Sequence, residues 1–204
     1  MFDRASRSKE LSVKTLAKWI SEQNIIDYIY KDVRHPELIS KSADLLSGLA
    51  KNSMLSEETL LLIWETCTNE HKHEAVTESI LSVISNIASS LPIEMINLII
   101  ESIHKLPIQT LGSYSTYFNT FYLNSLSVFR AGYGKGNAER KLSKLINLNI
   151  YWEAIQDESE LPDKMKLQTL DVLVELMDVL DHSNTSEFMK KAIEGLEQSI
   201  SPIK

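Results

Sequence analysis

Residues 73–103 read HEAVTESILSVISNIASSLPIEMINLIIESI. Apolar residues recur in this stretch at the period of an amphipathic helix, about 3.6 residues, and Pro92 interrupts the pattern. We therefore predict one helix from about Lys72 to Ser89 and a second that opens at Pro92, where a first-turn proline loses no helical hydrogen bond. Strand-like alternation is almost absent from the chain, so the fold is predicted to be all-α.

The same helical pattern divides the remaining sequence, with breakers and capping residues at the boundaries. Further helices are predicted after Ser12, from Pro36, after the N-cap candidate Ser56, over 113–130, from Asn137 through Ile155, and over 163–180 and 186–199, with a turn or short helix at 24–31. Roughly nine helices with short connections suit either a bundle or a solenoid.

The tryptophans favour the solenoid. Trp19, Trp64 and Trp152 are separated by intervals close to one and two units of about 40–47 residues, the length of a HEAT or armadillo unit. We predict an armadillo/HEAT-like α-solenoid of stacked helical hairpins, with an irregular helical bundle as the alternative. The expected organisation is a disordered tail at 1–10 and a single helical-repeat domain at 11–200, with a Gly-rich connector at 131–137.

Composition excludes several classes of protein. The 21 Lys and Arg residues against 28 Asp and Glu residues give a net charge of −7, which disfavours a nucleic-acid partner. No apolar run approaches the roughly 18 residues that span a bilayer, and the first residues lack the apolar core of a secretory signal. One cysteine forms no internal disulfide. We expect a soluble, cytoplasmic protein with protein partners and no membrane or nucleic-acid partner.

Several short stretches, in order, resemble a known family. They include LSVKTLAKWISEQNI at 11–25, Lys72-His-Glu-Ala75, and Leu148-Asn-Ile-Tyr-Trp152 followed by acidic residues. Together they are similar to part of the long non-catalytic region of the fat-facets-type ubiquitin-specific proteases, over most of 11–180. The stretch 105–147 departs from the family in length and content. The resemblance implies an armadillo/HEAT-type segment upstream of a deubiquitinase catalytic domain.

That family hydrolyses the isopeptide bond between ubiquitin and its substrate with a cysteine nucleophile and a histidine base. The family's cysteine box is of the Gly-Asn-Thr-Cys-Tyr type, whereas this chain has Glu65-Thr-Cys-Thr-Asn69, and its histidine box has no counterpart here. No catalytic residue carries over, and we expect neither a cofactor nor a metal.

Two other motifs are weighed against plainer interpretations. Cys67 and His71 are an i, i+4 pair, but a nucleophile needs an oriented base and a structural zinc site needs four ligands, so a buried thiol is favoured. The run from Gly132 to Gly136 precedes a helix N-terminus and could cradle an anion. It lacks the spacing of a phosphate-binding loop, so a flexible connector is favoured.

The aromatic run is the sharpest local feature. Tyr114, Tyr117, Phe118, Phe121 and Tyr122 fall on one helical stripe. A stripe with this spacing is most often core-facing. Because three tyrosines are included, and tyrosine anchors many interfaces, these five residues are also our candidate partner-contact site.

The acidic residues around Pro162 have two interpretations, and the terminal helices predict exposed apolar surface. The acidic residues are either a solvated loop or a contact for a basic partner; they are Glu153, Asp157, Glu158, Glu160 and Asp163. Both terminal helices carry apolar residues, so we expect the fragment to expose apolar surface or self-associate if flanking repeats are missing; these are Leu11, Val13, Leu16, Phe188, Met189, Ile193 and Leu196.

The leading functional hypothesis is a non-catalytic helical-repeat scaffold that positions partners, including ubiquitinated substrates, for a large deubiquitinase. One alternative is a stand-alone helical-repeat adaptor unrelated to ubiquitin. The other is a small helical enzyme that uses Cys67 and His71.

Overall fold

The computed structural model describes residues 13–33, 35–68, 73–156 and 159–180, with Ser186, Met189, Lys190, Ile193 and Glu194. Within this part of the chain every regular element is a helix, as the periodicity predicts. The chain forms two compact units, 1–83 and 84–204, and each is described by itself. The single domain expected at 11–200 stays a prediction, and the tail expected at 1–10 lies outside the described residues.

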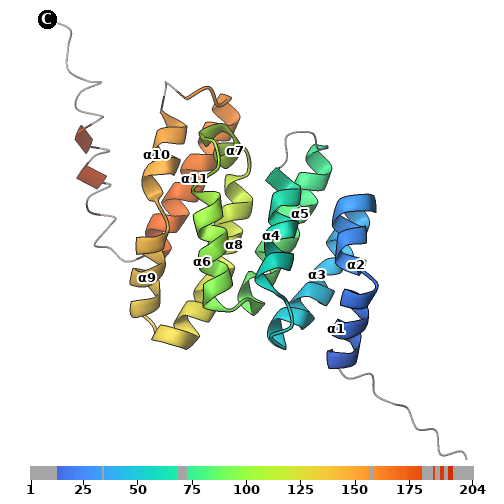
Figure 1. The fold of residues 1–204 in the computed structure, drawn as a ribbon. Helices are drawn as coiled ribbons and strands as arrows, with labels where there is room; N and C mark the ends of the chain where they lie inside the picture. The colour runs from blue at the N-terminus through green and yellow to red at the C-terminus, as the bar shows by residue number, and fades with distance from the viewer. Residues whose placement is uncertain are drawn as a thin grey trace, which may run out of the picture. The chain divides into compact units, whose positions relative to one another are not determined.

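The first unit is built from consecutive helices (Figure 1). Its elements are α1 (Val13–Glu22), α2 (Ile25–Asp27), the π-helical segment η1 (Tyr28–Val33), α3 (Pro36–Lys51), α4 (Glu57–Thr68) and most of α5 (Glu74–Ile87). Pro36 opens α3 and Ser56 caps α4, its Oγ accepting the Thr59 backbone N–H at 3.2 Å. Both boundaries match the sequence prediction. The cap predicted at Ser12 lies outside the described residues.

The core of the first unit contains two consecutive buried hydrogen bonds. Ser42 Oγ donates to the Ile39 carbonyl at 2.7 Å, so the Tyr30 hydroxyl donates to Ser42 Oγ, 2.6 Å away. Burial raises the pKa of Tyr30 to about 12, against the smaller lowering effect of Ser42. The hydroxyl therefore stays protonated, and the two hydrogen bonds tie η1 to α3 among apolar side chains.

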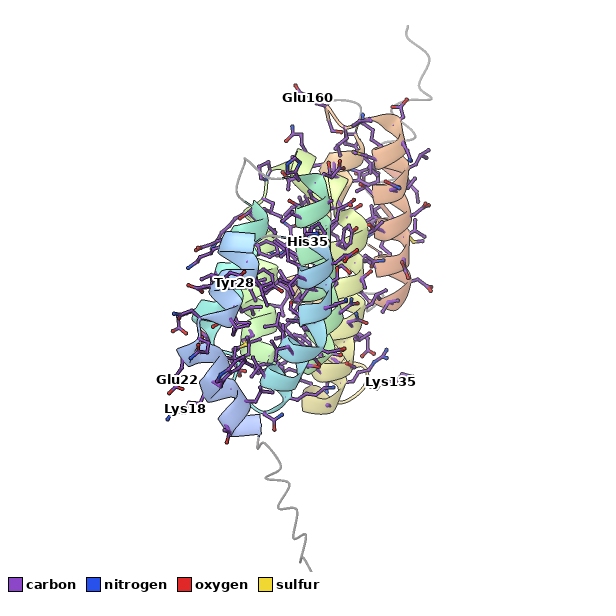
Figure 2. The ribbon with its side chains drawn as sticks, turned by 90° about the vertical axis from the view of Figure 1, so that its right-hand side faces the viewer. Lys18, Glu22, Tyr28, His35, Lys135 and Glu160 are labelled. Carbon is purple, nitrogen blue, oxygen red and sulfur yellow. The ribbon has the colours of Figure 1, made fainter. Side chains whose placement is uncertain are left out.

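The outer surface of this unit carries short-range charge pairs. Lys18 Nζ lies 3.6 Å from Glu22 Oε1 one turn along α1, and both side chains are labelled in Figure 2. Exposed pairs of this kind contribute little to stability. Trp19, beside them on α1, is exposed, as is Tyr28. Leu16 is also partly exposed.

The second unit is arranged around one long helix, α8 (Ser115–Tyr133). The other elements are the end of α5, the 3-10 turn η2 (Ala88–Ser90), α6 (Ile93–Ile103), α7 (Ile108–Ser113), α9 (Asn137–Leu145), α10 (Leu148–Ile155) and α11 (Asp163–Val179) (Figure 1). α8 packs against η2, α6, α9 and α11, while α10 packs against α7 and α11. α8 is thus the central helix of this unit.

Three boundaries of the second unit differ from the sequence prediction. The helix predicted from Asn137 through Ile155 is two helices, because Ile146 is extended and the Asn147 side chain caps α10, accepting the Asn149 backbone N–H at 3.2 Å. α7 is an additional helix. The glycine connector is shorter than 131–137, because α8 continues through Tyr133 and α9 begins at Asn137.

Close backbone packing holds α7 against the chain that follows α10. A Cβ atom on Gly112 would collide with a methyl group of Leu161, whose side chain is buried. On the facing helix, the Thr169 Oγ1 lies 3.4 Å from the Gly112 carbonyl and donates to the Met165 carbonyl at 2.8 Å. Only glycine permits this approach without a shift of the neighbouring side chain.

Candidate functional site

Four residues of the predicted aromatic stripe lie on α8, and Tyr114 immediately precedes this helix. Phe118, Phe121 and Tyr122 are almost completely buried, and Tyr114 and Tyr117 are half-buried. The core-facing alternative therefore describes the first three rings, which are packed inside the second unit and are not accessible to a partner. For Tyr114 and Tyr117 the partner contact stays a prediction.

One buried residue of the stripe, Tyr122, meets a buried tyrosine of α10. Tyr151 of α10 donates its hydroxyl to the Tyr122 hydroxyl at 3.4 Å. Burial raises the pKa of both phenols well above their ordinary value, so both remain neutral. The Phe121 and Tyr122 rings pack edge to face, with centroids 6.1 Å apart. Neutral, buried hydroxyls and interlocked rings are features of a packed core rather than of an acid–base site.

The half-buried tyrosines lie where α8 is tied to the end of α5. Ser85 donates its hydroxyl to the Tyr117 carbonyl at 2.8 Å, and Asn124 Nδ2 donates to the Ser85 carbonyl at 2.9 Å. The Tyr114 and Tyr117 rings are tilted at 54°, with centroids 6.4 Å apart. These hydrogen bonds tie the N-terminal half of α8 to the end of α5.

The glycine connector is an ordered corner with internal partners. Gly134 and Gly136 have φ angles of 76° and 87°, which favour glycine. The Glu139 carboxylate accepts the Gly136 backbone N–H and the Arg130 Nε–H, the latter at 2.7 Å. Burial raises the pKa of Glu139, but these hydrogen bonds and the Arg130 charge outweigh it and hold the pKa below its usual value.

This arrangement disfavours anion binding by the glycine connector. Glu139 already places a carboxylate at the N-terminus of α9, where an external anion would bind. Lys141, on the next turn, lies over the Tyr133 ring, with Nζ 3.5 Å from the ring centroid. The corner is therefore a structural connection between α8 and α9.

Cys67 is buried in α4, as the favoured interpretation expects. His71, its predicted partner, lies outside the described residues. Among the residues that are described, no group of three His, Cys, Asp or Glu side chains is arranged to hold a metal ion. No helix in that part of the chain is long and apolar enough to cross a membrane.

An open hollow of about 440 Å³ lies between α7 and the end of α10. It is lined by Ile108, Gln109, Glu153, Gln156, Ser159 and Glu160. Its rim is fixed by Lys166, which donates to the Gln156 carbonyl at 2.8 Å, and by Ser159, which donates to the Ala154 carbonyl at 2.6 Å. Glu160 is labelled on the loop that leads to α11 (Figure 2).

The hollow brings together part of the predicted acidic cluster. Glu153 and Glu160 line it and are exposed, Asp163 begins α11, and Asp157 and Glu158 lie outside the described residues. The hollow is thus lined by one apolar side chain and five polar ones, two of which are exposed carboxylates.

Comparison with known proteins decides the family. The family described as "UBP24/USP9X/USP9Y ARM repeat" matches residues 2–202, which is nearly the whole chain. The chain belongs to this family. The all-α helical-repeat fold predicted from the sequence is confirmed, and armadillo is the repeat that the family description names. The predicted resemblance to the fat-facets-type proteases is confirmed as well.

One curated relative of this ARM repeat chain is "Ubiquitin carboxyl-terminal hydrolase puf" of Drosophila melanogaster. The two are 27% identical over 78 residues, which is 38% of this chain and 2% of the relative. The chain therefore spans a very small part of that relative. No solved structure matches the chain significantly.

Sequence reasoning missed two surfaces of this ARM repeat chain. One is the α7 wall of the hollow, which Pro107 before an apolar Ile108 signals as a helix start. The other is a second apolar stripe on α11, formed by the exposed Leu167, Leu170 and Val174. Its signal is that apolar residues on 163–180 cover more of the helix circumference than a single buried face needs.

Proposed function

We propose that this chain is a non-catalytic, protein-binding segment of a large deubiquitinase. The observation that carries the proposal is the extent of the family match: the ARM repeat accounts for residues 2–202, so the chain corresponds to repeat region throughout. The similarity to a named ubiquitin carboxyl-terminal hydrolase supports the link to ubiquitin removal. The buried Cys67 thiol supports the absence of catalysis by this segment.

The partners we propose are proteins, including ubiquitinated substrates held for the catalytic domain. Repeat helices offer extended surfaces for such contacts. The hollow between α7 and α10 offers two exposed carboxylates, and the start of α8 offers Tyr117 together with Tyr114, which precedes the helix. The negative net charge supports basic protein surfaces over nucleic acid as partners. A single, buried cysteine fits a cytoplasmic location.

The first test is catalytic. The isolated chain is expected to release no fluorophore from ubiquitin-rhodamine. Cleavage that disappears in a Cys67→Ala variant, with unchanged helical content by circular dichroism, would establish the enzyme alternative instead.

The second test separates scaffold from adaptor in the parent protein. The pair Glu153→Gln/Glu160→Gln is compared with Glu65→Gln/Glu94→Gln, which removes the same charge from exposed positions elsewhere. We expect the hollow pair to slow removal of ubiquitin from protein conjugates while ubiquitin-rhodamine cleavage is unchanged, and the control pair to change neither. If the hollow pair and the control pair remove ubiquitin from protein conjugates at the same rate, the result would count against substrate positioning through the hollow.

A further inference from the structure

A pocket of about 230 Å³ lies in the first unit, between α1, α2 and the turn that joins α3 to α4. Its floor is aliphatic and consists of the buried side chains Ile20, Ile26, Leu49 and Leu55. Its rim is polar, and the rim side chains are exposed or half-buried; they are Ser21, Asn24, Asp27, Ser56 and Thr59. An aliphatic floor under a few polar groups is typical of pockets that bind a ligand or anchor a partner's side chain.

Two unusual backbone positions bound this pocket. Asn24, at the corner between α1 and α2, has a φ angle of 51°, and Ser53, which precedes the lining residues Met54 and Leu55, has a φ angle of 56°. Among the described residues, these are the non-glycine residues with a positive φ angle. Glycine adopts this conformation without strain, whereas a residue with a Cβ atom does so at a cost. Positions of this kind cluster at binding sites.

Asn24 places an amide at the rim of the pocket. Its side chain is exposed and does not cap α2. An amide both donates and accepts hydrogen bonds, so it matches the peptide group of another protein. On the opposite rim, Ser56 Oγ already accepts the Thr59 backbone N–H at 3.2 Å and lies 3.1 Å from the Thr59 hydroxyl. Asn24 is therefore the rim residue best placed to bond an incoming peptide.

The charges around the pocket favour an uncharged occupant. Among the lining residues Asp27 alone is ionisable, and Lys31 Nζ lies 3.0 Å from its Oδ2. An acidic occupant would be repelled by Asp27, while a cation would lose water against the aliphatic floor and share its carboxylate with Lys31. Other charged residues near the lining in sequence are exposed and do not line the pocket; they are Lys18, Glu22, Lys51, Glu57 and Glu58.

The volume narrows the choice further, because clefts for cofactors and similar small molecules hold about 300–1,000 Å³. This pocket is smaller. We propose that it binds one aliphatic side chain, of the size of leucine, on a loop of a partner protein, and that the adjoining peptide group bonds to the Asn24 amide. The site belongs to the first unit, whereas the hollow beside α7 belongs to the second, so each stands or fails independently.

The test is a titration of the full chain with N-acetyl-leucine methylamide, which carries one leucine side chain between two peptide groups. NMR of isotope-labelled isoleucine methyl groups reports binding at Ile20 and Ile26. We expect saturable shifts of these two methyl groups. N-acetyl-alanine methylamide is expected to bind roughly tenfold more weakly or worse, because three buried carbon atoms are lost. N-acetyl-arginine methylamide is expected to bind no better than the alanine probe.

Three variants separate binding from folding. Ala17→Leu fills the pocket from α1 and is expected to abolish the shifts, whereas Thr15→Leu, on the opposite side of the same helix, is expected to leave them unchanged. Asn24→Gly relieves the left-handed backbone but removes the amide. In this variant the helical content is expected to be kept while binding of the leucine probe weakens severalfold.

The proposal is overturned if the leucine probe gives no saturable shift, or if its binding survives in Ala17→Leu or is unchanged in Asn24→Gly. Arginine that binds as tightly as leucine would also overturn it, and would favour a basic partner. Shifts of Ile20 and Ile26 that follow protein concentration without any probe would overturn it in favour of a second copy of this chain as the occupant.

Discussion

Helices α8 and α11 carry apolar stripes with the same helical spacing, but the structure treats the stripes differently. The rings of Phe118, Phe121 and Tyr122 on α8 are buried, whereas Leu167 and Val174 on α11 are exposed. α8 is contacted by η2, α6, α9 and α11, while the helices that pack on α11 meet its other side. Spacing therefore identifies an apolar face, and only the neighbouring elements determine whether that face is covered.

The largest expected effect is the difference between Phe121→Ala and Val174→Ala. Truncating a fully buried phenylalanine removes contacts on all sides and leaves a cavity, so the free energy of unfolding is expected to fall by about 3–5 kcal/mol. Val174 is 57% exposed, so its truncation is expected to lower the free energy by less than about 1 kcal/mol. Urea unfolding followed by circular dichroism measures both.

The comparison fails if the two losses are similar. A small loss for Phe121→Ala would mean that the core around α8 relaxes into the cavity. A loss of several kcal/mol for Val174→Ala would mean that the α11 stripe is covered on more than one side.

Sequence periodicity predicted the helices well wherever one apolar stripe runs between clear breakers. Pro36, Ser56 and Pro92 mark helix starts that the structure reproduces. The pattern failed at Ile146 and Asn147, because apolar spacing continues across a break that a side-chain cap and a distant histidine stabilise. The tryptophans pointed to the right fold class, although Trp19 is exposed and Trp64 is buried.

The candidate site was less predictable than the fold. Four of the five aromatic residues lie on α8, but Tyr114 lies at the junction between α7 and α8, and burial of three of the rings depends on helices far away in sequence, such as α10 with Tyr151. The acidic cluster was visible in the sequence, whereas the hollow that contains Glu153 and Glu160 needs α7 as its other wall. Long-range packing of this kind leaves no local signal.

A second prediction tests how tightly α7 packs against Leu161, which precedes α11. Gly112→Ala places a methyl group against Leu161, next to the contact between Thr169 and the Gly112 carbonyl. Overpacking outweighs the better helix propensity of alanine, so we expect a loss of about 1–2 kcal/mol in the free energy of unfolding.

Gly48→Ala in α3 is the matched control for this substitution. A Cβ atom at Gly48 meets nothing within 4 Å, so the same change is expected to stabilise by about 0.5–1 kcal/mol. Chemical denaturation of both variants gives the comparison. A stabilised Gly112→Ala would show that the contact between α7 and Leu161 is loose.

A third prediction tests the polar contact behind α8. Tyr151→Phe removes the hydroxyl that donates to Tyr122 while it keeps both rings in place. Because the bond is buried but long, the expected loss is about 0.5–1.5 kcal/mol in the free energy of unfolding. Tyr133→Phe, at an exposed position, is expected to change it by less than about 0.5 kcal/mol. Equal effects would mean that the buried hydroxyl pair contributes nothing specific.

The smallest expected effect lies outside both stripes, where His104 joins the end of α6 to the start of α10. His104 Nε2 accepts the Asn147 backbone N–H at 3.2 Å, which only a ring unprotonated at that nitrogen does. Desolvation lowers the pKa of His104, against the opposing charge of Glu101. The folded state thus binds fewer protons than the unfolded state near the ordinary histidine pKa of 6.5.

This contribution is fully present above pH 6.5 and is lost as the pH falls through the lowered pKa of the folded state. The free energy of unfolding should therefore decline slightly between pH 7.5 and pH 5.5. In His104→Gln the amide oxygen can still accept the Asn147 N–H but does not titrate, so the decline should be smaller in this variant. Since Glu139, whose pKa is also lowered, titrates at more acidic pH, it does not contribute in this range. Parallel pH profiles for the two proteins would show that His104 does not link α6 to α10 in solution.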